Sequence, residues 1–220
     1  MPSDKAVVHV IDDDEAVRQS LVFLLGTAGL EVRTYDSATA FLDALPNVAA
    51  GCVITDVRMP VVSGIELLRR LRKLKLAVPV IVITGHGDVP LAVEAMKMGA
   101  ADFLEKPFDD EALLASVRSA LNALDRNRKR EAERSEIKTR LSGLSSRERE
   151  VLEGLVAGQA NKQIAHALGI SPRTIEIYRA NLMTKMQAAS LSDLVRMAMI
   201  AGILGPQSNS DAADAGPAIA

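Results

Sequence analysis

Short runs of β-branched and other apolar residues alternate with longer stretches of helical period over the first half of the chain. The runs typical of strands are residues 6–11, 31–35, 52–55, 80–84 and 102–105. The later runs are apolar at nearly every position, which is typical of parallel strands buried on both faces. The pattern therefore predicts an α/β fold with a doubly wound, five-stranded parallel sheet and helices on both of its faces.

From residue 110 onward the pattern is helical only. Apolar residues at 113, 114, 117, 121 and 124 have the spacing of a helix stripe, and no Gly or Pro follows up to residue 142. The charged stretch after this stripe either continues as a helix or forms a flexible tether. We expect an α/β domain (1–122), a helical or charged linker (123–142), a small all-α domain (143–204) and a disordered tail of small and polar residues (205–220).

Helix start and stop signals divide the small C-terminal domain. Ser145, with Glu148 three residues later, has the pattern of a capping box and predicts a helix start. Gly158 predicts the end of that helix. Asn161 is then placed to cap a second helix, which Gly169 ends.

A third helix is predicted from Ser171-Pro172 to about residue 186, because Ser is a favoured N-cap and Pro a favoured first helical residue. Its inward stripe is Ile175, Leu182 and Met186. The outward positions are Arg173, Thr174, Glu176, Ile177, Arg179, Ala180, Asn181 and Lys185. A helix-turn-helix of this kind reads the major groove of DNA, although periodicity alone fits a helical bundle for protein contacts equally well.

Charge is divided unevenly along the chain, whose formal net charge is −2. Residues 1–125 carry 12 basic against 18 acidic side chains, and residues 126–204 carry 14 against 8. Residues 126–140 alone hold 7 of those basic and 3 of those acidic side chains, so charge by itself is weak evidence for DNA binding. No apolar run approaches the roughly 20 residues of a membrane span, and the N-terminus lacks a signal-peptide pattern, so we expect a cytoplasmic protein.

Reactive side chains follow the predicted strands at the end where parallel strands meet. These are Asp12, Asp13, Asp56, Thr84 and Lys106. Carboxylates brought together repel one another unless a cation joins them, and a hard ion such as Mg²⁺ prefers oxygen ligands. The cluster predicts a Mg²⁺ site, with Asp13, Asp56 and the backbone carbonyl of Arg58 as ligands.

Asp56 is then placed to attack phosphorus, because a neutralised carboxylate can approach a phosphoryl group. Lys106 is expected to contact the transferred oxygens. Thr84 can donate its hydroxyl to one of them and is the candidate switch residue. Asp14, the third acid of its run, is expected to cap the following helix.

The segments VIDDDEAVR, ITDVRMPVVSGIELL, VIVITGHGD and GAADFLEKPF resemble, in order and spacing, the signature segments of bacterial response-regulator receivers, which have a flavodoxin-like fold. The resemblance implies that Asp12 and Asp13 are the acid pair that binds the metal with Asp56, the phosphate acceptor. It also implies that Thr84 acts with Phe103, an aromatic residue that moves inward on phosphorylation. A homodimer of phosphorylated receivers is the implied consequence.

The segments SSREREVL, NKQIA and SPRTIEIYRANLMTKM resemble the LuxR-type DNA-binding domain. The side chains that this resemblance and the outward positions assign to DNA are Lys162, Arg173, Thr174, Glu176, Arg179, Asn181 and Lys185. The whole chain resembles the nitrogen-fixation regulators among response regulators. That implies a haem-bearing, oxygen-sensing histidine kinase as phosphate donor, double-stranded DNA and RNA polymerase as partners, and activation of nitrogen-fixation genes.

Two alternatives remain beside this interpretation. A phosphatase with an aspartate nucleophile needs a second acid two residues after it, where this chain has Arg58, so an enzyme is not expected. A receiver that serves as an unphosphorylated docking module, with constitutive DNA binding, would not need the set Asp56, Thr84 and Lys106. The sequence therefore favours a phosphorylation-controlled regulator.

Overall fold

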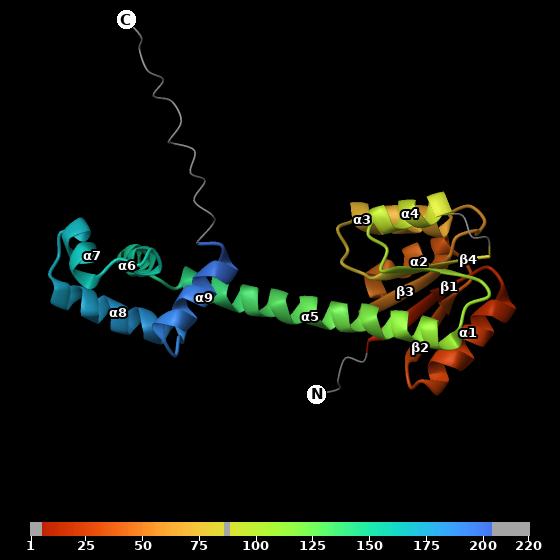
Figure 1. Cartoon of the computed structure of the whole chain (residues 1–220), viewed down its shortest axis with the longest axis horizontal. Coiled ribbons are helices and arrows are strands. Elements are labelled where there is room, and N and C mark those ends of the chain that lie inside the picture. The colour runs from red at the N-terminus through yellow and green to blue at the C-terminus, as the bar shows by residue number, and fades with distance from the viewer. Residues whose placement is uncertain (1–5, 86–88, 204–220) are drawn as a thin grey trace, which may run out of the picture. The chain divides into compact units, whose positions relative to one another are not determined.

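The computed structural model describes residues 6–85 and 89–203, and the chain divides into two compact units, Met1–Arg128 and Lys129–Ala220 (Figure 1). The tail predicted at 205–220 lies outside the described residues. No helix in the described part of the chain is long and apolar enough to cross a membrane.

The first unit is an open parallel sheet with helices between its strands. Its elements are β1 (Val7–Ile11), α1 (Glu15–Thr27), β2 (Glu31–Tyr35), α2 (Ala38–Ala44), the 3-10 helix η1 (Leu45–Asn47), β3 (Gly51–Asp56), α3 (Gly64–Lys73), β4 (Val80–Thr84), α4 (Val89–Lys97), β5 (Asp102–Glu105) and the start of α5 (Asp110–Ser142). The strand order is β2-β1-β3-β4-β5 and every pair is parallel, which confirms the predicted doubly wound sheet. The order reverses between β1 and β3, where ligands bind beyond the carboxyl ends of the strands.

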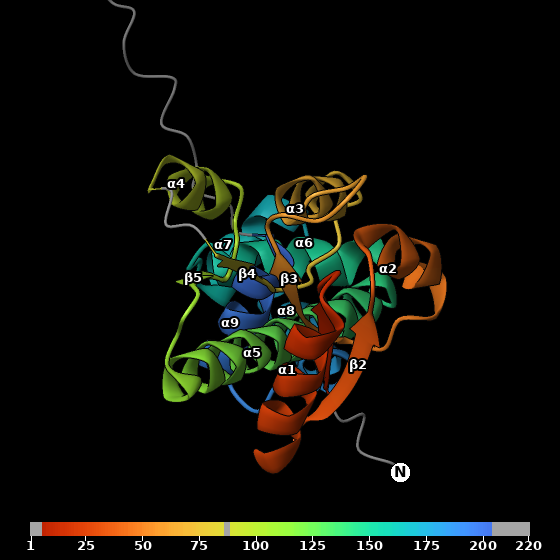
Figure 2. The ribbon, with the colours of Figure 1, turned by 90° about the vertical axis from the view of Figure 1, so that its right-hand side faces the viewer.

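Alternate residues of the central strands fill two separate cores. Val53 and Val82 pack in the cluster that includes side chains of α2, α3 and α4, whereas Ile54 and Ile83 pack in the cluster that includes side chains of α1 and α5. Figure 2 shows these two groups of helices on opposite faces of the sheet. Because both faces are covered, β1, β3 and β4 are buried along their whole length. This agrees with the prediction from the later runs, which are apolar at nearly every position.

The second unit is all-helical. It contains the end of α5, then α6 (Ser146–Val156), α7 (Asn161–Leu168), α8 (Pro172–Met186) and α9 (Leu191–Ala201). Ile137 and Leu141 of α5 are buried in its core, so the unit begins before residue 143. Helix α5 thus continues through the stretch expected to be a helical or charged linker.

Most helix ends of this unit lie where the capping signals predict them. Ser145 caps α6 in a full capping box with Glu148, and the N-cap of α8 is Ser171. Gly169 ends α7 with a left-handed backbone, φ 67°. The prediction that Asn161 caps α7 is wrong. Residue 160 is the N-cap, and its carbonyl accepts from the N–H groups of Gln163 at 2.8 Å and Ile164 at 3.1 Å, which an Asn161 cap would otherwise bind.

Candidate functional site

Four predicted side chains converge at the carboxyl edge of the sheet. Asp12 follows β1, Asp56 ends β3, Thr84 ends β4 and Lys106 follows β5. The two acids and the threonine are buried, and Lys106 is half-buried. Together with Asp13 they form what we call the acidic pocket.

Lys106 lies between the two buried acids. Its Nζ is 3.0 Å from Asp12 Oδ2 and 2.8 Å from Asp56 Oδ1. Burial by itself lowers the pKa of Lys106, but the hydrogen bonds that Lys106 donates to Asp56 and Asp12, together with the negative charges of these acids, outweigh that effect and raise the pKa above its usual value. Lys106 therefore carries its charge at neutral pH and balances part of the charge of the two carboxylates.

The second carboxylate oxygen of Asp56 is held by the backbone. The N–H of Arg58 donates to Asp56 Oδ2 at 2.5 Å, while the Arg58 side chain is exposed. Lys106 and this N–H thus bind different oxygens of Asp56, which fixes the orientation of its carboxylate.

The loop after β1 is held by its own acids. Asp12 Oδ1 accepts from the N–H of Asp14 at 2.9 Å. The Asp14 side chain accepts from the N–H groups of Ala16 and Val17 and caps α1, as predicted. The acids of this run therefore have different tasks: Asp12 faces Lys106, and Asp14 starts a helix.

Arg18 belongs to the same loop arrangement, although its sequence pattern did not single it out. Its Nη1 donates to the backbone carbonyls of Asp12 at 2.7 Å and Asp13 at 3.0 Å. Arg18 thereby ties α1 to the backbone that carries the acid pair. The only sequence signal is a basic residue four positions after the acid run, which is too common to be informative.

Gly64 supports Asp56 from behind and was also missed. A Cβ on Gly64 would lie 2.2 Å from the backbone oxygen of Asp56, and the Gly64 N–H donates to the carbonyl of Val57 at 3.2 Å. Only glycine allows α3 to begin so close to the end of β3. A glycine at the first position of a helix was the available signal.

Thr84 and Phe103 lie on neighbouring strands. Val82 pairs with Phe103, and Thr84 pairs with Glu105 two positions further along. Thr84 is fully buried, while Phe103 is half-buried against the core on the α2–α4 side of the sheet. The two side chains predicted to act together therefore belong to one strand pair, close to Lys106.

The acidic pocket offers the donor chemistry of a hard divalent cation. Asp12 and Asp56 present carboxylate oxygens, and Asp13 lies beside Asp12 with an exposed side chain. Among residues 6–85 and 89–203, no three or more His, Cys, Asp or Glu side chains are grouped as a metal site, and Lys106 stands between two of the acids. The residues fit such an ion in chemistry and charge, with Lys106 as a competing cation.

Helix α8 presents the predicted inner and outer faces. Ile175, Leu182 and Met186 are fully buried, as predicted. The exposed or half-exposed side chains of the predicted DNA set are Lys162 on α7 and Arg173, Thr174, Glu176, Arg179, Asn181 and Lys185 on α8. The outer face of α8 is therefore available for a partner.

Lys185 differs from the other members of this set. Its Nζ is 2.7 Å from Oε2 of Glu148, a buried acid that also accepts from the N–H and hydroxyl of Ser145. The hydrogen bond from Lys185, followed by those from Ser145, lowers the pKa of Glu148. Lys185 thus joins the end of α8 to the start of α6, and part of its charge is already compensated.

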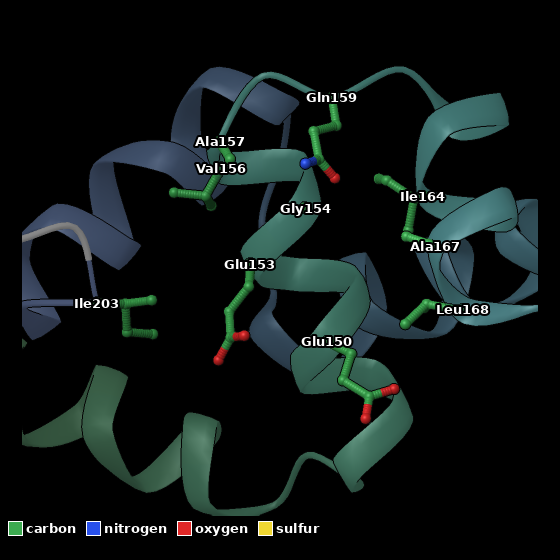
Figure 3. A pocket seen from close by; sticks show the side chains of 10 residues that line it. All are labelled: Glu150, Glu153, Gly154, Val156, Ala157, Gln159, Ile164, Ala167, Leu168 and Ile203. Atoms are coloured by element: carbon green, nitrogen blue, oxygen red, sulfur yellow. The ribbon is translucent and has the colours of Figure 1, made fainter. Parts of the chain in front are cut away.

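A separate hollow of about 420 Å³ lies between α6 and α7 (Figure 3). Apolar side chains such as Ile164 and Leu168 line it, with Glu150 and Glu153 at its edge. Gly154 permits the close approach of the two helices, because a Cβ there would lie 2.8 Å from Ile164 Cγ1. None of the predicted DNA-binding residues lines this hollow.

Two family models match separate parts of the chain. Residues 8–118 match the response regulator receiver domain, and residues 142–198 match the bacterial regulatory proteins of the luxR family. The transcriptional regulatory protein FixJ of Azorhizobium caulinodans is 62% identical over 89% of this chain and 93% of its own.

Solved structures give the same result. The response regulator StyR is 40% identical with a TM-score of 0.78, over 89% of this chain and 98% of its own. Full-length FixJ from B. japonicum is 58% identical with a TM-score of 0.58, over 91% and 99%. Both similarities extend over the receiver and the helical unit. The chain therefore belongs to the two-component response regulators, as a transcriptional activator that joins a receiver domain to a LuxR-type DNA-binding domain.

Proposed function

We propose that Asp56 accepts the phosphoryl group from a sensor histidine kinase. The observation that carries this proposal is the position of Lys106, which contacts both Asp56 and Asp12 in a buried pocket. An anionic group arriving at Asp56 would meet a cation already in place. Family membership supports the same chemistry, since receivers are phosphorylated on aspartate.

We further propose that Asp12, Asp13, Asp56 and the backbone carbonyl of Arg58 hold Mg²⁺. When bound, the ion supplies the positive charge that lets a phosphoryl group approach the carboxylates. Arg18, by binding the carbonyls of Asp12 and Asp13, keeps the acid pair oriented toward the pocket.

Thr84 and Phe103 are the proposed switch. The Thr84 hydroxyl would donate to a phosphoryl oxygen, and Phe103 would move inward beside it. The expected output is a homodimer through α4, β5 and α5. Val89, Val93 and Met96 support this face, because these α4 side chains are exposed and apolar.

Dimerisation would strengthen DNA binding without any new base contact, because the second of two linked units binds at a high effective concentration. In the DNA-binding unit of each protomer, we propose that Lys162 contacts the DNA backbone. The α8 side chains that we propose for the major groove are Arg173, Thr174, Glu176, Arg179 and Asn181. Lys185, paired with Glu148, would contribute least of the predicted set.

The similarity to FixJ supports a narrower assignment. We propose that the chain acts in the cytoplasm and activates nitrogen-fixation genes together with RNA polymerase. Its kinase would be a haem-bearing oxygen sensor of the FixL kind. These partners rest on the resemblance of whole chains rather than on any single side chain.

The test is phosphorylation with acetyl phosphate and Mg²⁺, followed by intact mass and by binding to operator DNA. The parent chain and Asp43→Asn, a matched change of an exposed acid, should gain a phosphoryl group, and Asp56→Asn should not. A mass gain that persists in Asp56→Asn would overturn the assignment. Equal operator binding before and after phosphorylation would favour the constitutive docking module instead.

A further inference from the structure

Helix α5 carries a row of three basic side chains within the second unit, Arg130, Arg134 and Lys138, which we call the basic stripe. All three are exposed. Positions four apart on a helix differ by about 40° in direction and about 6 Å in height, so the stripe covers one side of α5 over roughly 12 Å.

The charge of the stripe is not compensated by acids among the described residues. None of its three side chains forms an ion pair with any residue in 6–85 or 89–203. Two of the nearby acids have other partners, because Glu133 pairs with Arg196 of α9 and Glu136 pairs with Arg140. Like charges four residues apart destabilise a helix, so a polyanion that neutralises them would be bound favourably.

The stripe runs into the core of the DNA-binding unit. Ile137 and Leu141, which flank Lys138 on α5, are buried in that core. Arg140 Nη1 donates to the carbonyl of Met186 at 3.0 Å, at the end of α8. The last turns of α5 are therefore fixed to the helix that carries the proposed base contacts.

The helices after α5 have little net positive charge of their own. Residues 144–204 carry 7 basic and 5 acidic side chains, and Glu176 lies on the outer face of α8, where it opposes phosphate binding. Residues 126–140 carry 7 basic and 3 acidic side chains. Most of the attraction for a polyanion thus resides on α5.

We propose that the basic stripe binds phosphates of double-stranded DNA, as a second contact that does not depend on base sequence. The partner is a duplex rather than a second copy of this helix, because two basic stripes repel each other. The base contacts of α8 select the site, and the stripe adds affinity at any sequence.

The experiment measures binding of the unphosphorylated full chain to a mixed-sequence duplex by fluorescence anisotropy at several salt concentrations. The double variant Arg130→Gln with Arg134→Gln removes two charges while keeping good helix formers. The matched control is Lys73→Gln with Lys75→Gln, which removes two exposed charges from the receiver. Because each phosphate contact contributes about 0.9 to the slope of log K against log salt, the stripe variant should lose about 1.8 of slope and the control none.

A third variant, Arg130→Lys with Arg134→Lys, separates charge from structure and should keep the parent slope. An equal slope in the stripe variant and its control would overturn the proposal. So would a loss of slope in the lysine variant, since the effect would then follow from damage to α5. Because no phosphorylation is involved, these results are independent of the role of Asp56.

Discussion

The two units assemble their functional side chains in opposite ways. In the receiver, Lys106 meets Asp12 across 94 positions of sequence, and the acidic pocket combines residues from the ends of four strands. In the DNA-binding unit, the proposed contacts lie along α7 and α8, between Lys162 and Lys185. The receiver's chemistry therefore depends on the whole sheet, whereas DNA recognition depends on how one helix is held.

Each unit also buries an acid against a lysine, with different consequences. Lys106 bridges two acids at the edge of the sheet, where an incoming anion can take over part of its contacts. Lys185 binds a single acid, Glu148, which is also bonded to Ser145, so this pair joins two helices. The first pair suits a reaction, and the second suits a scaffold.

The largest expected effect comes from a cavity in one core. Leu152→Ala removes a fully buried side chain of the DNA-binding unit and should destabilise that unit by about 3 kcal/mol. DNA binding should fall, while phosphorylation by acetyl phosphate is retained. The reciprocal variant, Leu68→Ala in the receiver, should weaken phosphorylation first. Hydrogen exchange followed by mass spectrometry measures both units in one sample, and an equal loss of protection in both units would contradict their independence.

A smaller effect is expected behind the proposed phosphate acceptor. Gly64→Ala places a Cβ against the backbone of Asp56 and should cost the receiver about 2 kcal/mol, because backbone cannot yield as a flexible side chain does. Phosphorylation should slow, and binding of α8 to DNA should not change. Gly26→Ala in α1 is the control, since its Cβ meets nothing within 4 Å and Ala favours a helix. Similar urea midpoints for the two variants would contradict the explanation.

As the pH falls, the receiver should lose stability before the DNA-binding unit does. Burial lowers the pKa of His9, which is held by the carbonyl of Ala49, so the folded receiver keeps it neutral. As pH falls below about 6.5, the unfolded chain binds a proton that the folded receiver does not, and receiver stability decreases until the pH passes below the folded pKa. Glu148 has a lowered pKa in the fold, so its stabilisation persists above the ordinary glutamate value of about 4.3 and is lost only as pH falls through its folded pKa.

Each unit contains one tyrosine, so the pH dependence of its stability can be measured separately. Urea unfolding followed by tyrosine fluorescence reports on the receiver in Tyr178→Phe and on the DNA-binding unit in Tyr35→Phe. The receiver should weaken first, and His9→Phe should remove most of its response near pH 6. A DNA-binding unit that weakens at the same pH as the receiver would be evidence against the assignment.

The smallest expected effect is a gain in the stability of the receiver. Val61, in the loop before α3, has φ 68° and a side chain that is 92% exposed. A β-branched residue is strained in this backbone conformation, and Asn tolerates it better. Val61→Asn should raise the thermal midpoint of the receiver by an amount equivalent to about 1 kcal/mol, with no change in the DNA-binding unit. An unchanged midpoint would mean that the loop relaxes without cost.

Much of the fold follows from local patterns. Three strands, β2, β4 and β5, begin and end where the sequence pattern predicts. Among them β4 is buried along its whole length, as a nearly continuous apolar run requires. The helix ends at Ser145 and Ser171 were predictable, because capping acts within one turn. The cap proposed for Asn161 failed because the N-cap lies one residue earlier, and the carbonyl of Ala160 binds the N–H groups that an Asn161 side chain would bind.

The acidic pocket was predictable as a set, but its internal bonds were not. Strand ends of a parallel sheet meet at one edge, so Asp12, Asp56 and Lys106 could be grouped from the sequence. That Lys106 binds both acids depends on strand order and side-chain direction. Arg18 and Gly64 act through backbone atoms of the pocket, and contacts to backbone leave almost no trace in residue type.

The succession of strands and helices, the buried stripe of α8 and the unequal division of charge can all be read from the chain without its fold. These features arise from neighbours within a few residues, where period and capping rules operate. Which of the charges are compensated by an ion pair depends on the tertiary structure. It pairs Lys185 with Glu148 and leaves Arg130 and Arg134 without a partner among the described residues. Charge in a sequence is a count, whereas its availability depends on which opposite charge the fold brings within reach.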